Sequence, residues 1–173
     1  ETYDYIKSNI KTNWLAPEWE NFDLLVEEYI DGDEVDIDII LQNGKIKFYS
    51  ISDNFNKTHE RFFLDSGQAI PSGLPERDQK KLIDCAEETI EKLGIRDGII
   101  HFEAKISKDV VYPIEANLRM GGDYIYSYLK GAWGVDYVEN AAKIALGVHI
   151  KIDRPANPLK YIVGWDLQPE YSG

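Results

Sequence analysis

Two apolar runs joined by a short polar tip constrain the fold of this chain more than any other feature. Over residues 100–105, apolar side chains occupy the even positions and polar side chains the odd ones, which is the period of a half-buried β-strand. A second apolar run begins at Val110, directly after the polar tip 107–109. We therefore predict an antiparallel β-hairpin over residues 98–117.

Three oxygen-bearing side chains are expected on one face of this hairpin. Glu115 and Asn117 are two residues apart and so point to the same side of their strand, where Glu103 joins them if the numbers of paired residues add to an even value. Two neighbouring carboxylates repel each other unless a cation lies between them. With an amide oxygen they form the all-oxygen ligand set that suits Mg²⁺, often with nucleotide phosphates completing the shell.

The alternative is a solvated sheet face on which acidic residues simply meet water. That alternative explains one glutamate on one strand, but here Arg119 and the pair Gly121 and Gly122 follow soon after Asn117. Glycine lets the backbone come close to a ligand. The combination favours a binding site, although Pro113 requires its strand to lie at a sheet edge or to contain a bulge.

The rest of the chain combines strands and helices. Asn43-Gly44 is the strongest hairpin signal in the sequence. Antiparallel strands with a few helices give an α+β domain, with the helices packed on one face of the sheet. The expected elements are strands over 24–30, 34–41, 45–52 and 159–165, helices over 75–93, 124–130 and 135–146, and a long functional loop over 53–75 that is a candidate lid.

The composition fits one globular domain and argues against several kinds of partner. The 173 residues carry 31 acidic and 19 basic side chains, a net charge of -12, so neither nucleic acid nor membrane is expected as a partner. No apolar run is long enough to cross a bilayer and no signal-peptide pattern is present, so a cytoplasmic location is expected. The single Cys85 excludes an internal disulfide and a cysteine-rich metal site.

Seven segments of this chain, taken together, resemble the ATP-grasp family. One is similar to the family's hinge strand and two to its metal-binding strands, whereas the other four resemble carboxylate–amine ligases of the carnosine-synthase and L-amino-acid-ligase type. Their order and spacing carry the resemblance, which covers roughly residues 24–147. The segments are 26–34 for the hinge, 98–103 and 114–119 for the metal strands, and 52–54, 71–74, 119–122 and 133–136 for the narrower match.

The resemblance implies a role for each candidate site residue. The hinge backbone would hydrogen-bond adenine while Ile30 packs on the base, and Glu34 would hold the ribose, with a solvated position as its alternative. Mg²⁺, or Mn²⁺ in its place, would bind two carboxylates and one amide. An arginine would contact the transferred phosphoryl group, and two glycines would offer backbone N–H groups near the substrate carboxylate. The residues are Glu27, Glu28, Ile30 and Glu34 for the nucleotide, Glu103, Glu115 (bridging two ions) and Asn117 for the metal, and Arg119, Gly121 and Gly122 for catalysis; His101 is interpreted as a surface partner of Glu103.

The resemblance also implies a reaction and a missing partner. ATP would convert a carboxylate into an acyl phosphate, which an amine attacks to form a peptide bond between amino-acid-like substrates. The segments match the C-terminal half of the fold only, so this chain would be the metal and adenine–ribose lobe and its partner an upstream lobe of the same protein. The expected segments are an N-terminal helix and aromatic linker over 1–23, the C-terminal lobe over 24–152, and an extension over 153–173.

The alternative function is a non-catalytic nucleotide-binding or assembly module that keeps an ATP-grasp-like fold. The intact set of Glu103, Glu115, Asn117 and Arg119 favours the ligase, because a module without turnover has little reason to retain all four. The family's upstream lobe carries lysines that bind the ATP phosphates, and no segment of this chain resembles that lobe. The absence of these lysines favours the module for this chain taken alone. Either way, we expect the chain by itself to fold without catalysing ligation.

Overall fold

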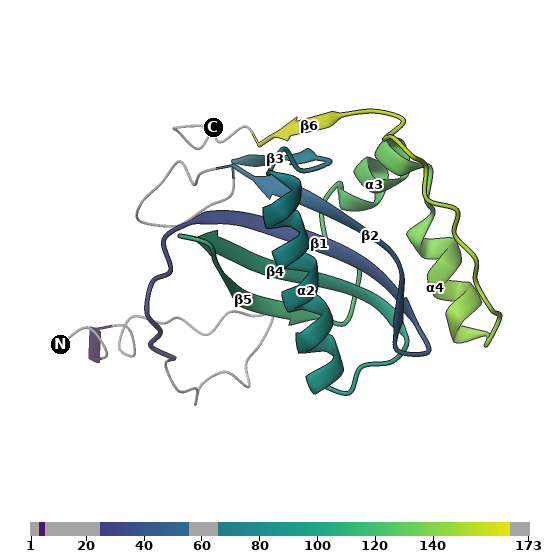
Figure 1. Ribbon diagram of the computed structural model, residues 1–173, viewed down its shortest axis with the longest axis horizontal. Helices are drawn as coiled ribbons and strands as arrows, with labels where there is room; N and C mark the ends of the chain where they lie inside the picture. Colours follow the sequence, from purple (N-terminus) through teal and green to yellow (C-terminus); the bar gives the residue numbers. More distant parts are fainter. Residues whose placement is uncertain (1–3, 6–24, 56–65, 167–173) are drawn as a thin grey trace.

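A computed structural model describes residues 4–5, 25–55 and 66–166 of the chain (Figure 1). Its centre is one antiparallel sheet of six strands, accompanied by three helices, so the predicted α+β class is confirmed. The strands follow one another across the sheet in the order β5-β4-β1-β2-β3-β6. Their bounds are Asp33–Gln42 for β1, Lys45–Asn54 for β2, Gly67–Ile70 for β3, Gly98–Ser107 for β4, Val110–Asn117 for β5 and Ile162–Trp165 for β6.

Strand β1 is the middle of the sheet and the basis of its core. It pairs with β2 on one side and with β4 on the other. The turn into β2 has positive φ at both Asn43 and Gly44 (57° and 70°), the conformation that a two-residue hairpin of this twist requires. The apolar residues at odd positions of β1, from Val35 to Leu41, are almost completely buried. The predicted alternation therefore sets which side of the sheet faces the core.

Helix α2, Glu76–Lys92, covers that apolar side of the sheet. Its buried residues Leu82, Ala86 and Ile90 repeat at three and four positions, so they form one stripe that packs against β1 and β4. The helix begins after Pro75 and ends just before Gly94, which has a φ of 71°. These bounds confirm the helix predicted over 75–93.

Helices α3, Ile125–Trp133, and α4, Tyr137–Ala145, pack on the opposite side of the sheet. There, Ile40, Phe48 and Ile99 form an apolar patch near the β1–β2 turn, and the two helices cover it. Figure 1 shows α2 crossing the front of the sheet while α3 and α4 lie beyond its right-hand end. The expectation that all helices share one face does not hold for α3 and α4, because the second apolar patch also needs cover.

Three further expectations differ from the structure or lie partly outside it. Residues 25–30 form no strand: Leu25 and Val26 are exposed, and no strand among the described residues pairs with them. The expected loop over 53–75 contains the end of β2 and all of β3, whereas its residues 56–65 lie outside the described part. The N-terminal helix and aromatic linker over 1–23 also lie outside it, apart from Asp4 and Tyr5.

The tail joins the sheet, because β6 lies within the stretch 159–165 and pairs with β3. The segment boundaries at 23/24 and 152/153 stay predictions. Across the ranges that the structure describes, none of the helices has both the length and the apolar character that spanning a membrane requires.

Candidate functional site

The β4–β5 hairpin brings the three predicted metal ligands to one face. Glu103 lies directly opposite Glu115, and Asn117 lies opposite His101 on the same face. The register shifts between Glu103 and Ala104, which faces Pro113, and β5 is an edge strand of the sheet. The proline therefore has both the edge position and the bulge that we expected, and the predicted placement of the three ligands is confirmed. Their role as ligands stays a prediction.

The polar rows of the hairpin continue across the sheet onto β1. Asp36 pairs with Glu103, and Asp38 pairs with His101. Asp36 is buried and accepts a hydrogen bond of 2.8 Å from Nδ2 of Asn54. Burial raises the pKa of Asp36 from 3.8 to about 7, since an ionised carboxylate loses its hydration there. The face that carries the expected metal ligands therefore also carries buried carboxyl groups.

His101 lies between two carboxylates and is not the surface residue that the sequence analysis expected. Only 7% of it is exposed, and its Nδ1 atom lies 3.0 Å from Oδ1 of Asp38. Its Nε2 atom lies 3.6 Å from Oε1 of Glu103. Burial acts to lower the pKa of His101, but the hydrogen bond to Asp38 and the nearby negative charges outweigh it, so the pKa is raised.

A cavity of about 510 Å³ contains every residue predicted to bind the nucleotide. Lys105 organises this cavity: its Nζ atom lies 3.1 Å from Oε2 of Glu34 and donates to the carbonyl of Ile30 at 3.2 Å. Glu34 is thus part of a half-buried ion pair rather than a solvated acid, although contact with a ribose stays a prediction. The lining residues are Glu27, Glu28, Tyr29, Ile30, Glu34, Glu103, Lys105, Tyr112, Pro113 and Ile114.

The predicted catalytic residues lie in the loop between β5 and α3. Arg119 is exposed and donates from Nη1 to the carbonyl of its neighbour Met120. Gly121 packs against the imidazole of His101 so closely that a Cβ atom would lie 2.9 Å from Nδ1 of that ring, whereas a Cβ on Gly122 would meet open space. Only Gly121 therefore has a structural reason to be glycine, and it is contact with His101.

The donor set fits a hard cation that takes some of its ligands from elsewhere. In the ranges that the structure describes, no group of three or more His, Cys, Asp or Glu side chains is arranged to hold a metal ion. Glu103 and Glu115 supply two carboxylates side by side. The Nδ2 atom of Asn117 is buried and has no hydrogen-bond partner among the described residues, so this N–H donor lacks an acceptor such as a phosphate oxygen, whereas the amide oxygen would be the metal ligand. Two carboxylates and one amide leave room for phosphate oxygens.

Sequence reasoning missed Asp36, Asp38 and Lys105. The two aspartates alternate with the apolar residues of β1, which is the usual pattern of a solvated face. They are buried because α3 and α4 cover part of that face. The signal for Lys105 was its place on the same strand face as Glu103, two residues away.

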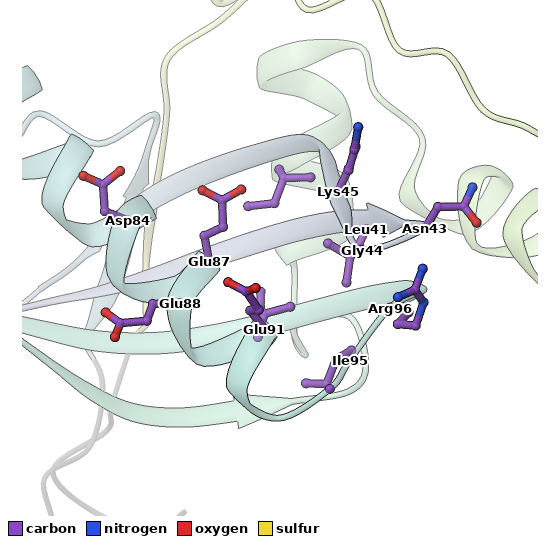
Figure 2. Close-up of a pocket in the computed structure, with 13 residues that line it drawn as sticks. Leu41, Asn43, Gly44, Lys45, Asp84, Glu87, Glu88, Glu91, Ile95 and Arg96 are labelled. Carbon is purple, nitrogen blue, oxygen red and sulfur yellow. The ribbon is translucent and has the colours of Figure 1, made fainter.

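A larger cavity, about 710 Å³, lies on the opposite side of the sheet, between α2 and the β1–β2 turn. Figure 2 shows Asp84, Glu87, Glu88 and Glu91 projecting from the helix along this cavity. None of the predicted site residues lines it. Each of the two cavities is lined by four carboxylates, so acidic charge does not distinguish them. Only the smaller one is lined by residues predicted to bind the nucleotide.

Comparisons with known proteins point to one family. A model of the ATP-grasp domain matches residues 1–127, including the first 23 residues that the motif resemblance left out. Carnosine synthase 1 from Gallus gallus is 33% identical over 147 residues, which cover 84% of this chain and 16% of that protein. This chain therefore spans about one sixth of the length of that relative.

Two solved structures show the same fold. An L-amino acid ligase from Bacillus licheniformis superposes with a TM-score of 0.60 at 27% identity, covering 66% of this chain and 30% of that one. A phosphoribosylglycinamide synthetase from Anaerococcus prevotii superposes with a TM-score of 0.63 at 17% identity, covering 70% of this chain and 30% of that one. The second likeness extends to the fold alone.

Proposed function

This chain belongs to the ATP-grasp family, and we propose that it is the metal and adenine–ribose lobe of an ATP-dependent carboxylate–amine ligase. The observation that carries the proposal is a cavity lined by the residues expected to bind the nucleotide and by one of the three expected metal ligands, which lies directly opposite a second one. The segment 27–34 and the hairpin residue Glu103 line it together. Its volume of about 510 Å³ lies within the range typical of small-molecule sites.

Within this cavity the nucleotide contacts follow from the positions of the residues. Glu27, Glu28 and Ile30 line the cavity, and backbone N–H and C=O groups of this segment would hydrogen-bond the edge of the base. Ile30 and Ile114 offer apolar surface on either side of the cavity. Lys105 holds Glu34 by a salt bridge, which fixes the carboxylate that would accept hydrogen bonds from the ribose hydroxyls.

Glu103, Glu115 and Asn117 would hold Mg²⁺, or Mn²⁺ in its place, beside the nucleotide phosphates. A bound divalent ion neutralises phosphate oxygens and orients them for transfer. Glu115 is the exposed member of the set and Glu103 the half-buried one. Glu115 would be the ligand shared by two ions.

The reaction we propose is peptide-bond formation between amino-acid-like substrates. The γ-phosphoryl group of ATP passes to a substrate carboxylate, giving ADP and an acyl phosphate. An amine then attacks the acyl carbon, and inorganic phosphate leaves as the amide forms. Arg119 would stabilise the charge on the transferred phosphoryl group through its forked guanidinium, and the backbone N–H groups of Gly121 and Gly122 would bind the substrate carboxylate. The names of two relatives, carnosine synthase and L-amino acid ligase, support this choice of substrates.

The partner we propose is an upstream lobe of the same protein that covers the phosphates from the other side. This chain spans a small share of its relatives, and its net charge of -12 is unfavourable for several phosphates without added cations. A site held from one side would leave the phosphates in water, where in-line transfer lacks fixed geometry. The alternative function, a non-catalytic nucleotide-binding module, is favoured only for the chain taken alone.

A phosphate-release and amide-formation assay across pairs of amino acids tests this proposal. A longer polypeptide that includes the upstream lobe should release phosphate only when both a carboxylate and an amine substrate are present. This chain alone should fold but release none. Rapid turnover by the chain alone would contradict the one-sided site, and nucleotide binding by the longer protein without turnover on any pair would favour the non-catalytic module.

A further inference from the structure

His101 lies where three parts of the proposed site meet. Asp38 on β1 contacts one ring nitrogen and Glu103 on β4 approaches the other. The backbone of Gly121, in the loop that carries Arg119, rests on the ring. The proposed function gives neither Asp38 nor His101 a task, although both are buried.

We propose that Asp38 and His101 form a buried couple that positions the metal ligand Glu103 and the loop carrying Arg119. The inference rests on the proposed function, because it takes Glu103 to be a metal ligand. Both residues of the couple are positioning residues, which act through the groups they touch and do not themselves contact a metal or a substrate.

Asp38 is the fixed end of the couple. Its exposure is 0%, and its backbone carbonyl accepts a hydrogen bond of 3.0 Å from the hydroxyl of Tyr137 on α4. Its neighbour across the strands, Ser50, accepts one of 2.9 Å from the indole Nε1 of Trp133 on α3. The two helices thus hold this point of β1 in place.

The carboxylate of Asp38 is costly for a merely structural group. Its Oδ2 atom is buried without a hydrogen-bond partner among the described residues, and a buried carboxylate destabilises a fold unless it is well paired. Replacing a buried ion pair by apolar side chains of similar size is often neutral or stabilising. The hydrogen bond to His101 is therefore better explained by what it does to the imidazole than by a contribution to stability.

The orientation of the imidazole follows from its two carboxylate neighbours. A carboxylate accepts hydrogen bonds, so the proton that lies between Asp38 and His101 is assigned to Nδ1 of the ring. With its proton on Nδ1, the neutral ring presents the lone pair of Nε2 to Oε1 of Glu103, 3.6 Å away, so two acceptors face each other and the Glu103 carboxylate is turned toward a cation. Groups behind a metal ligand that fix its orientation typically contribute about 10- to 100-fold to metal affinity.

At Gly121 the loop after β5 comes close to the same imidazole ring. Its position would place a Cβ atom 2.9 Å from Nδ1 and 3.0 Å from Cε1 of His101, closer than side-chain atoms pack. The same Cβ atom would lie 2.9 Å from Cγ2 of Ile125. The loop can therefore pass this close to the ring because residue 121 has no side chain, and Arg119 stands two residues earlier in that loop. The couple connects a metal ligand and a catalytic loop through one side chain.

The first test uses NMR of the imidazole without metal. The native chain should show a ring proton on Nδ1 of His101 in slow exchange with water. Asp38→Asn should lose that proton signal and shift the backbone amide of Gly121, whereas Ser50→Ala should change neither. Ser50→Ala is a matched control, because it removes a buried hydrogen bond beside Asp38 without touching His101. A ring proton in fast exchange in the native chain would overturn the couple.

The second test measures the affinity for Mn²⁺ in the presence of ADP by electron paramagnetic resonance of the free ion. Asp38→Asn should weaken Mn²⁺ binding by about 10-fold or more. Ser50→Ala should keep the native Mn²⁺ affinity, although it should lower the stability to urea at least as much as Asp38→Asn does. His101→Gln, which keeps an N–H donor for the carboxylate of Asp38, should retain more affinity than His101→Ala.

The outcomes separate this inference from the function on which it rests. If Mn²⁺ binding depends on Glu115 but Asp38→Asn binds Mn²⁺ as tightly as the native chain, the positioning role is overturned and the proposed function stays intact. Equal losses in Asp38→Asn and Ser50→Ala also overturn it, since stability alone would then explain the effect. No Mn²⁺ binding by the native chain overturns both.

Discussion

Glu115 is the residue on which the metal part of the account depends most. It lies opposite Glu103 on the edge strand β5 and is exposed, and a bound cation would offset the repulsion between the two carboxylates. The buried carboxyl groups of β1 form the other half of this face. Predictions at the scale of single residues follow from these two features.

Glu115→Gln should weaken the binding of Mg²⁺–ADP by tenfold or more, equivalent to about 1.4 kcal/mol. The substitution keeps the shape of the side chain but removes one of the two charges that the ion would need. Glu88→Gln is the control, because Glu88 lies on the exposed side of α2 and pairs with Lys92 at 2.6 Å. Isothermal titration calorimetry measures both, and equal affinities of the two variants would count against the metal site.

Asp36 should make the stability of the native chain fall as the pH rises. Its pKa is about 7 in the folded chain and 3.8 is its ordinary value, so folding favours the protonated form. The stabilisation is complete below about pH 4 and is lost as the pH approaches about 7, by up to about 4 kcal/mol. Asp36→Asn, which cannot ionise, should lack this decline.

Urea unfolding of both proteins between pH 4 and pH 8, with EDTA present, measures the difference. The comparison isolates Asp36 because the other titrating groups are shared. If the unfolding free energies of the two proteins run parallel over this range, the burial of Asp36 is not what raises its pKa.

At the scale of elements, Lys105 joins the segment before β1 to strand β4. Its Nζ atom reaches Ile30 and Glu34 and lies 4.9 Å from the ring centre of Tyr29. Residues 25–30 belong to none of the strands in the described part of the chain, and this lysine links them to the sheet. The nucleotide cavity should therefore depend on it.

Lys105→Met should lower the affinity for ADP about tenfold while leaving the affinity for Mn²⁺ nearly unchanged. Methionine keeps the length of the side chain but loses the charge that holds Ile30 and Glu34. Lys81→Met is a suitable control, since Lys81 forms a salt bridge with Asp109 at the tip of the same hairpin, outside the cavity. Fluorescence of a labelled nucleotide reports the first affinity, and an unchanged value in Lys105→Met would refute the anchor.

The elements that the sequence predicted correctly are those with local signals. Alternation and the Asn43-Gly44 turn predicted β1 and β2, and helix periodicity predicted α2. Strand β3 was missed because its four residues form a strand only by pairing with β2 and β6, which are distant in sequence. The strand expected over 24–30 failed for the converse reason, since strand-forming residues without a partner strand form no ladder.

The candidate site also has one part that the sequence predicted and one part that it did not. The face shared by Glu103, Glu115 and Asn117 follows from the period of two on two adjacent strands. The burial of Asp38 and His101 does not, because it depends on α3 and α4 packing over that face from another part of the chain. Tertiary cover of this kind leaves no local pattern in the sequence.

At the scale of the whole molecule, two cavities lie on opposite sides of the sheet, and the account assigns the nucleotide to the smaller one. Each cavity is lined by four carboxylates together with basic side chains, which are Lys45 and Arg96 in the larger one and Lys105 in the smaller one. The assignment rests on the segment 27–30, Glu34 and Glu103, which line only the smaller cavity. The location of the bound nucleotide can therefore be tested without any turnover.

Amide chemical-shift mapping of the ¹⁵N-labelled chain, titrated with Mg²⁺–ADP, tests this assignment most directly. The account predicts shifts that cluster at 27–34 and at the hairpin residues Glu103, Glu115 and Asn117, and that largely disappear at the hairpin when Mg²⁺ is omitted. The amides of α2 from Asp84 to Glu91 and that of Arg96 should stay unchanged. Shifts confined to α2 and the β1–β2 turn, or no shifts at millimolar nucleotide, would contradict the assignment.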